Sequence, residues 1–328
     1  MDKRFLAFLL VILVLCLVPF TFDNSTTFMA MVMAKSLAVL GLLILLRADQ
    51  VSFGHAMFFA IGAYAAAFLS SSFRGIDLSL MILAGIVSSL IAGLIVGIFV
   101  TRYRGIFFGM INLAFSMVLY SVLEKAFHIT GGSDGMRIRR PTFLGMEFKR
   151  TEFDLVIYFT ILTIAALCCF LVWRYLRSPL GQALRAMKTN ETRLEYLGLS
   201  AKSVLLTGYV ISAVLCGLGG VLMGIVQGLA SPEHAFWTRS SEFVFIAVLG
   251  GPGHVAGAFG GTLIFELIRT YAASLLTDSW QLILVITLII IILWAPGGLV
   301  ELWNRVFNRK RKNAEGNVTT NTSSEANQ

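Results

Sequence analysis

The chain has 328 residues, of which 57% are apolar and only 13% are charged, and its formal net charge is +8 at pH 7. Charged residues are about half as frequent as in a soluble domain, so the composition excludes a water-soluble globular protein. The basic residues lie along loops and not among stacking aromatic side chains, which excludes a nucleic-acid-binding surface.

We therefore expect an all-α polytopic membrane protein with about 8 to 10 transmembrane helices, because each crossing needs about 20 apolar residues. A transmembrane domain is predicted over residues 1–304 and a disordered, polar cytoplasmic tail over residues 305–328. The predicted spans are Phe5–Phe20, Phe28–Leu46, Val51–Leu69, Ile76–Thr101, Gly105–Phe127, Phe153–Trp173, Val204–Leu229, Glu242–Leu249, Val255–Ala273 and Trp280–Trp294.

The first stretch, "MDKRFLAFLLVILVLCLVPF", has the basic start and apolar run of a signal peptide. It lacks an Ala-x-Ala cleavage pattern, so we interpret it as an uncleaved first span. Lysine and arginine are concentrated in segments that alternate along the chain, and this bias places both termini in the cytoplasm. The basic loop Arg137–Arg150 runs against that orientation.

Lys35, Glu266 and Arg269 fall in or at the ends of predicted spans, where a charge costs about 2.5 to 3.5 kcal/mol. Glu266 and Arg269 are three residues apart on one helix face and are predicted to neutralise each other, with a proton relay as the alternative. Lys35 has no charged partner nearby in the sequence, so we expect it to be a path or gating residue.

Two stretches of small residues are candidates for broken helices, "VSFGHAMFFAIGAY" and "AVLGGPGHVAGAFGG". The glycines of the second stretch should break a helix midway across the membrane, which is tolerable only where protein or a water-filled cavity covers the backbone. Both stretches contain a Gly-His step, and interrupted segments at corresponding places suggest an inverted repeat with a translocation path between its halves. The expected path residues are Lys35, Gly54, His55, Gly62, Gly250, Gly251, Gly253 and His254.

Other readings of these small and polar residues remain open. Glycines four residues apart share a helix face and pack neighbouring backbones closely, and His55 and His254 can form hydrogen bonds between helices. The four cysteines lie in apolar runs without metal-ligand spacing, so neither disulfides nor zinc is expected. No HExxH or clustered catalytic set occurs, so we predict no catalytic residue and no metal site.

A basic island, at about residues 174–203, interrupts the apolar chain. Leucine and methionine recur there at helical spacing, with charged residues on the other side. Asn190 can cap a second short helix, Gly198 can end it and Ser200 can cap the following span. Such a helix pair can lie along lipid headgroups, be a solvated loop, or dock into a groove of a soluble partner.

Four stretches resemble the permeases of ABC importers for branched-chain amino acids, in the family's order. The island sequence "LRAMKTNETRLEYLG" is similar to the family's cytoplasmic loop, "VSFGHAMFFAIGAY" to its early small-residue span, "TGGSDGM" to its extracytoplasmic loop and "GGPGHVAGAFGG" to its late glycine-rich break. Thr192 and Arg193 stand where the family usually has small residues. The resemblance implies an ATPase-coupling role for Arg185, Ala186, Asn190, Glu191, Arg193 and Gly198.

The resemblance also implies partners, namely ABC ATPase subunits, a second permease subunit and an extracytoplasmic substrate-binding protein, all at the bacterial inner membrane. ATP and magnesium would be used by the ATPase subunits, since no GxxxxGK[ST] motif occurs in this chain. The expected function is import of branched-chain amino acids by ATP-driven alternating access. The alternatives are a urea or short-amide permease of the same family, an ion-coupled secondary transporter and a membrane-embedded enzyme.

Overall fold

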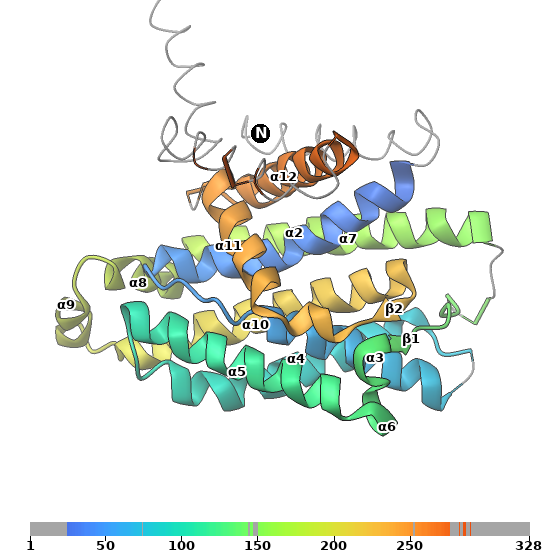
Figure 1. Ribbon diagram of the computed structural model, residues 1–328. Helices are drawn as coiled ribbons and strands as arrows, with labels where there is room; N and C mark the ends of the chain where they lie inside the picture. The colour runs from blue at the N-terminus through green and yellow to red at the C-terminus, as the bar shows by residue number, and fades with distance from the viewer. Residues whose placement is uncertain are drawn as a thin grey trace, which may run out of the picture.

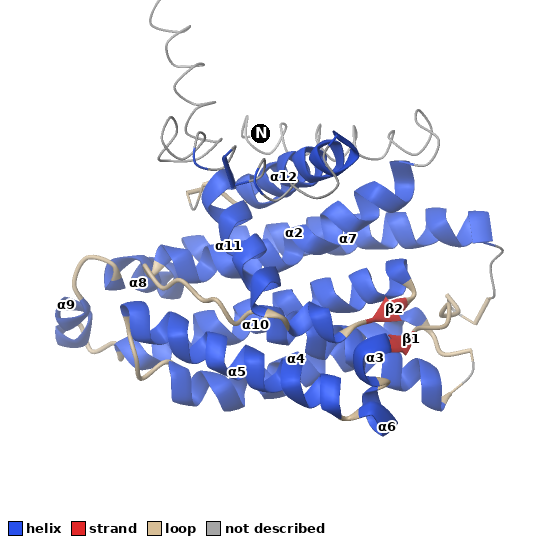
Figure 2. Ribbon diagram, in the orientation of Figure 1, coloured by secondary structure: helices blue, strands red, loops and turns tan. Residues whose placement is uncertain are grey.

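The computed structural model describes residues 25–275, apart from residues 74, 144, 147–149 and 252, together with residues 282, 285, 286 and 289. The described part of the chain is almost entirely helical, and two short strands form its only sheet (Figure 2). The predicted span Phe5–Phe20, most of Trp280–Trp294 and the tail 305–328 lie outside the described residues.

The long helices match the predicted spans closely. Within the described chain, five helices are long and apolar enough to cross a membrane. The prediction of an all-α polytopic membrane protein is therefore confirmed. The helices are α2 (Ser25–Arg47), α3 (Ala56–Ser72), α4 (Leu78–Val100), α5 (Gly105–Lys125), α6 (Phe127–Thr130), α7 (Arg150–Arg177), α8 (Pro179–Met187), α9 (Glu191–Tyr196), α10 (Ala201–Gln227), α11 (Trp237–Gly250) and α12 (Ala256–Leu275).

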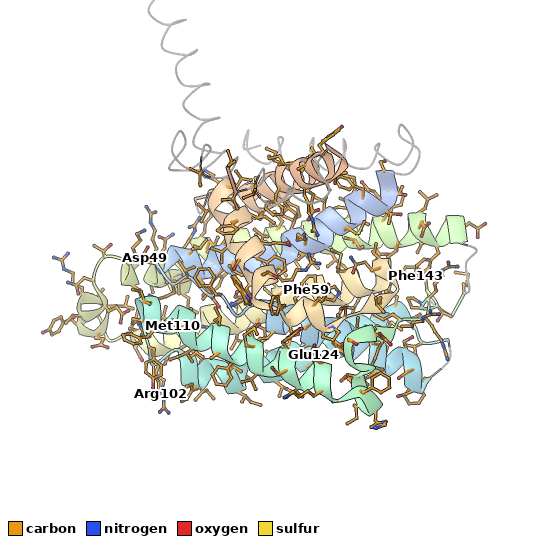
Figure 3. All side chains as sticks on the ribbon, viewed as in Figure 1. Asp49, Phe59, Arg102, Met110, Glu124 and Phe143 are labelled. Carbon is orange, nitrogen blue, oxygen red and sulfur yellow. The ribbon has the colours of Figure 1, made fainter. Side chains whose placement is uncertain are left out.

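The long helices lie side by side, and the connecting elements gather at the two ends of the bundle (Figure 1). One end carries α8 and α9. The other carries α6, the 3-10 helix η1 (Gly132–Asp134), and strands β1 (Met136–Arg137) and β2 (Leu229–Ala230), which pair antiparallel. Asp49 and Arg102 lie toward the α8–α9 end, Phe143 lies toward the strand end, and Phe59 lies between them (Figure 3).

Helix α10 forms the centre of the bundle and packs against α2, α3 and α4. Small residues allow this close packing: a Cβ on Gly62 would overlap the carbonyl of Gly217, and a Cβ on Gly220 would overlap the carbonyl of Phe59. Close backbone approach through glycine is how helices gain van der Waals contact in a membrane, where lipid removes the hydrophobic drive for association. Glycine spacing on α10 is thus explained by packing.

One predicted span, Val51–Leu69, is only partly helical, and another, Glu242–Leu249, lies within a longer helix. Helix α3 begins at Ala56 and not at Val51, because residues 49–55 form an irregular segment of turns and bends before the helix starts. Ahead of the predicted span Glu242–Leu249, strand β2 and the 3-10 helix η2 (Pro232–Ala235) precede α11. Helix α11 begins at Trp237, five residues before the predicted start at Glu242.

Candidate functional site

The predicted helix pair in the basic island is present, as α8 and α9. Ser178 caps α8 by accepting a hydrogen bond from the Gly181 amide, and Asn190 caps α9 by accepting one from the Arg193 amide (3.2 Å). Gly198 adopts a left-handed conformation (φ 80°) just beyond α9, and Ser200 caps α10. These caps confirm the predicted roles of Asn190, Gly198 and Ser200 in ending and starting helices.

The apolar side chains of this pair do not share one side, so that prediction is wrong in part. Leu184, Met187 and Leu194 are buried against the bundle. Tyr196 and Leu197 remain 87% and 78% exposed at the tip of the pair. The turn between α8 and α9 separates the faces of the two helices, which a single helical period across both could not anticipate.

Two ion pairs tie the helix pair to the loops of the bundle. Lys188 Nζ lies 2.9 Å from a carboxylate oxygen of Asp49, which follows α2. Arg104 Nε, between α4 and α5, donates to Glu191 Oε1 at 2.6 Å. The pair therefore contacts both the α2–α3 and the α4–α5 connections.

Helices α8 and α9, with the turns that flank α9, form a projection at one end of the bundle, residues 179–198. The structure brings the expected coupling residues together on this α8–α9 projection. Glu191 is half-buried through its contact with Arg104, and the other five are exposed. Their role in coupling to an ATPase stays a prediction. The exposed residues are Arg185, Ala186, Asn190, Arg193 and Gly198.

In the interior, two interrupted segments cross. The Ser240 hydroxyl accepts a hydrogen bond from the Ala56 amide (2.9 Å), and His234 packs edge-on against Phe59 with ring centroids 5.6 Å apart. Ala56 contacts Ser240 and the later residue Phe59 contacts the earlier residue His234, so the two segments run antiparallel. The Ser116 hydroxyl of α5 donates to the Ala235 carbonyl at 2.7 Å, which satisfies a backbone group outside regular helix.

The early small-residue span is packed tightly. His55 is fully buried, its Nδ1 lies 2.6 Å from the Ser52 hydroxyl, and its ring packs against Phe58 and Tyr209. A Cβ on Gly54 would overlap the backbone of Asn112. The assignment of Gly54, His55 and Gly62 to a translocation path stays a prediction, and the contacts described here are packing contacts.

The late glycine-rich stretch does not break a helix midway across the bundle, which corrects that expectation. Arg47, the last residue of α2, donates from Nη2 to the Gly253 carbonyl at 2.8 Å, so the turn lies at the end of α2. Gly250 packs against Gly257 where α11 meets α12, and Gly251 has a φ of 89°. The stretch forms a turn between two helices, because its glycines permit a sharp reversal there.

His254 is exposed, whereas His55 is buried, so the two Gly-His steps do not occupy equivalent places. The better sequence match to His55 is His234, which is also buried and packs against Phe59. A serine stands three residues before each histidine and an alanine directly after it, in 52–56 and 231–235. This Ser-x-x-His-Ala repeat was the signal in the sequence that the Gly-His comparison missed.

Lys35 is the centre of an interior ion cluster made of Lys35, Arg239, Glu242, Glu266 and Arg269. Lys35 is 2% exposed; its ammonium contacts Glu266 directly and lies 3.4 Å from Glu242. Arg239 lies 3.1 Å from Glu242, and Arg269 lies 3.9 Å from both carboxylates. The predicted pairing of Glu266 with Arg269 is confirmed.

Glu242 and Glu266 follow Lys35 by 207 and 231 residues, so no local pattern connects them with it. Arg239 and Glu242 were not singled out from the sequence at all. The available signal is the opposite charges of Arg239 and Glu242 three residues apart, which share a helix face just before a predicted span.

The chain is similar in sequence to known transport permeases. Residues 24–293 match the family model described as branched-chain amino acid transport system / permease component. The chain is 30% identical to the high-affinity branched-chain amino acid transport system permease protein LivM of Salmonella typhimurium, over 96% of the chain and 79% of that relative. It is 27% identical to the corresponding permease BraD of Pseudomonas aeruginosa, over 76% and 86%.

A shorter similarity, at 29% identity, links the chain to the nucleoside ABC transporter permease protein NupB of Lactococcus lactis. It covers 39% of the chain and 36% of that relative. No solved structure matches the chain with significance.

Proposed function

We propose, from the premise that this chain belongs to the permease component family of branched-chain amino acid transport systems, that it imports those amino acids by ATP-driven alternating access. Membership of the family and the apolar helices make it a multi-pass, inner-membrane permease subunit of an ABC transporter. The names of its relatives support branched-chain amino acids as the substrates.

The α8–α9 projection is the observation that supports ATP-driven coupling. Its exposed surface combines basic Arg185 and Arg193 with the apolar tip residues Tyr196 and Leu197. A helix that offers apolar anchors ringed by charges suits a groove in a soluble partner. On this proposal an ATPase subunit binds the tip, and the Asp49 and Arg104 ion pairs carry its movement to the long helices.

The proposal requires separate subunits for the remaining steps. ATPase subunits bind ATP and magnesium, an extracytoplasmic binding protein delivers the substrate, and a second permease, either a copy or a relative, completes the path. Both termini and the α8–α9 end face the cytoplasm. The charge bias along the chain supports this orientation.

The experiment is co-purification of ATPase subunits with the tagged permease from native membranes. Arg193→Glu reverses an exposed charge on α9. It should reduce ATPase recovery by about tenfold or more, because placing a like charge in a charged interface costs more than the roughly 1.4 kcal/mol that corresponds to a factor of ten. Lys202→Glu is the matched control, because Lys202 is an exposed cation in the first turn of α10, outside the projection. Equal ATPase recovery from wild type and Arg193→Glu would remove the docking role.

Glu191 requires a double variant, because it also pairs with Arg104. Glu191→Arg alone would break that internal ion pair and place two cations together. Glu191→Arg with Arg104→Glu restores the pair with its polarity reversed. If Glu191 acts only by holding the projection in place, the double variant should regain ATPase recovery; if Glu191 contacts the ATPase, it should not.

Substrate and energy source are tested in proteoliposomes that contain the complete complex. Leucine uptake should require ATP and the binding protein and should survive collapse of the proton gradient. Uptake of urea without leucine would assign the chain to the short-amide permeases. Uptake that persists without ATPase subunits but fails without the gradient would indicate an ion-coupled transporter.

A further inference from the structure

The interior ion cluster lies near the middle of the membrane-spanning region. At a rise of about 1.5 Å per residue, Lys35 lies about 18 Å along α2 from Arg47. Glu266 lies about 15 Å along α12 from Ala256, which follows the turn fixed to Arg47. With a hydrocarbon core of about 30 Å, both charges are close to the midplane.

The cluster has a buried centre and a partly exposed outer side. Exposure of the side chains rises from 2% at Lys35, through 16% and 18% at the two glutamates, to 21% at Arg239 and 31% at Arg269. A guanidinium facing lipid at this depth is costly, so arginines near the midplane face a bundle interior or a water-filled cavity. The outer side of the cluster therefore borders a polar path or a second permease subunit.

Helix α11 presents polar and apolar groups together on this side. Thr238, Glu242 and Phe245 follow at separations of four and three, so they share one face of the helix. Thr238 is exposed and Phe245 is 40% exposed. The Glu242 carboxylate, which is paired with Arg239, therefore shares a helix face with the partly exposed ring of Phe245.

We propose that this cluster binds the charged groups of a zwitterionic amino acid during transit, with Arg239 contacting the carboxylate and Glu242 contacting the ammonium. The substrate would replace the Arg239–Glu242 ion pair by two ion pairs of its own, and because a zwitterion carries one charge of each sign, the charge balance of the cluster would not change. Phe245 offers apolar contact for an aliphatic side chain. The buried Lys35 and Glu266 fix the position of Glu242.

This inference rests on the proposed function and makes it more specific. Urea and short amides carry neither a carboxylate nor an ammonium group, so they cannot form the two replacement ion pairs. A cluster of five charges near the midplane, expensive to place there, is accounted for by a substrate that is itself doubly charged.

The test is photolabelling of the complete purified complex with a leucine analogue that carries a diazirine in its side chain. In the wild type, label should map to α11 between Trp237 and Phe245 or to the facing part of α12. Leucine should compete for labelling, whereas isoamylamine, which lacks the carboxylate, should compete about tenfold or more weakly. Arg239→Gln should lower labelling by a similar factor, while Arg102→Gln, an exposed cation beyond α4, should not.

Label confined to another surface, such as the apolar groove of α5 around Met117 and Val122, would overturn the inference. Undiminished labelling of Arg239→Gln would also overturn it. If that variant does not assemble, the wild-type map and the isoamylamine competition still decide. Leucine uptake by a complex that is labelled elsewhere refutes this inference alone, whereas absence of leucine uptake refutes the proposed function.

Discussion

The charge of Lys35, in an apolar helix, is paired by residues far along the chain. Lys35 is held between carboxylates of α11 and α12, and these helices pack against α2 in the folded chain. The pairing of Glu266 with Arg269 could be predicted, because both residues lie three apart on one helix. The contacts of Lys35 could not, because no local rule states which helices become neighbours.

Gly62 provides a prediction at the residue scale. Gly62→Ala places a methyl group against the Gly217 carbonyl, so the backbones of α3 and α10 must separate. We expect a loss of stability of about 1 to 3 kcal/mol, typical of overpacking a tight contact. The measurement is the thermal unfolding midpoint of the purified permease in detergent.

Gly260→Ala is the matched control, because a Cβ at Gly260 meets nothing within 4 Å and the residue lies in helix α12. It should leave the midpoint unchanged or raise it, since alanine favours helix by up to about 1 kcal/mol over glycine. Equal midpoints for the two variants would contradict close α3–α10 packing through Gly62.

Among the secondary structure elements, the two crossing segments show how backbone outside regular helix is satisfied in the interior. The Ser240 hydroxyl accepts a hydrogen bond from the Ala56 amide, and the Ser116 hydroxyl donates one to the Ala235 carbonyl. Ser116 lies in a predicted apolar span, and Ser240 lies just before one, so neither hydroxyl could be assigned this role from the sequence. Their side-chain hydrogen bonds stabilise the places where α3 and α11 begin.

Ser240→Ala removes the acceptor of the Ala56 amide and leaves that buried group unpaired. We expect a loss of about 1 to 3 kcal/mol in unfolding free energy, the cost of an unsatisfied buried donor. Ser240→Thr, which keeps the hydroxyl, should recover most of that loss, and Ser71→Ala, on an exposed hydroxyl, should cost little. Unfolding by denaturant titration measures all three; a Ser240→Ala curve that superimposes on that of Ser71→Ala would rule out the role of this hydrogen bond.

Helix boundaries were predictable where the sequence carries caps. Asn190, Gly198 and Ser200 define α9 and the start of α10, because short polar side chains and glycine act locally at helix ends. The start of α11 and the place of the glycine-rich turn were predicted wrongly. Hydropathy is the same for extended and helical backbone inside a membrane, so only neighbours such as Arg47 and Ser116 distinguish them.

At the scale of the whole molecule, the two ends of the bundle carry different elements. The α8–α9 end carries the projection that is tied to Asp49 and Arg104. The strand end carries the folded loop with left-handed glycines at Gly131 and Gly135. We propose that the first end faces the cytoplasm, where ATPase subunits bind, and that the second end faces the substrate-binding protein. The all-α class and the places of the long helices could be predicted from the hydropathy of the sequence, and the ion cluster near the midplane could not.

The sidedness of the α8–α9 projection tests this assignment most directly. In a variant with all four native cysteines replaced, Thr189→Cys reports on the turn between α8 and α9, and Ser133→Cys reports on the strand end; both positions are exposed. A membrane-impermeant maleimide applied to intact cells should label Cys at position 133 and not at position 189, and inverted vesicles should give the reverse. Labelling of position 189 from outside intact cells would contradict the account.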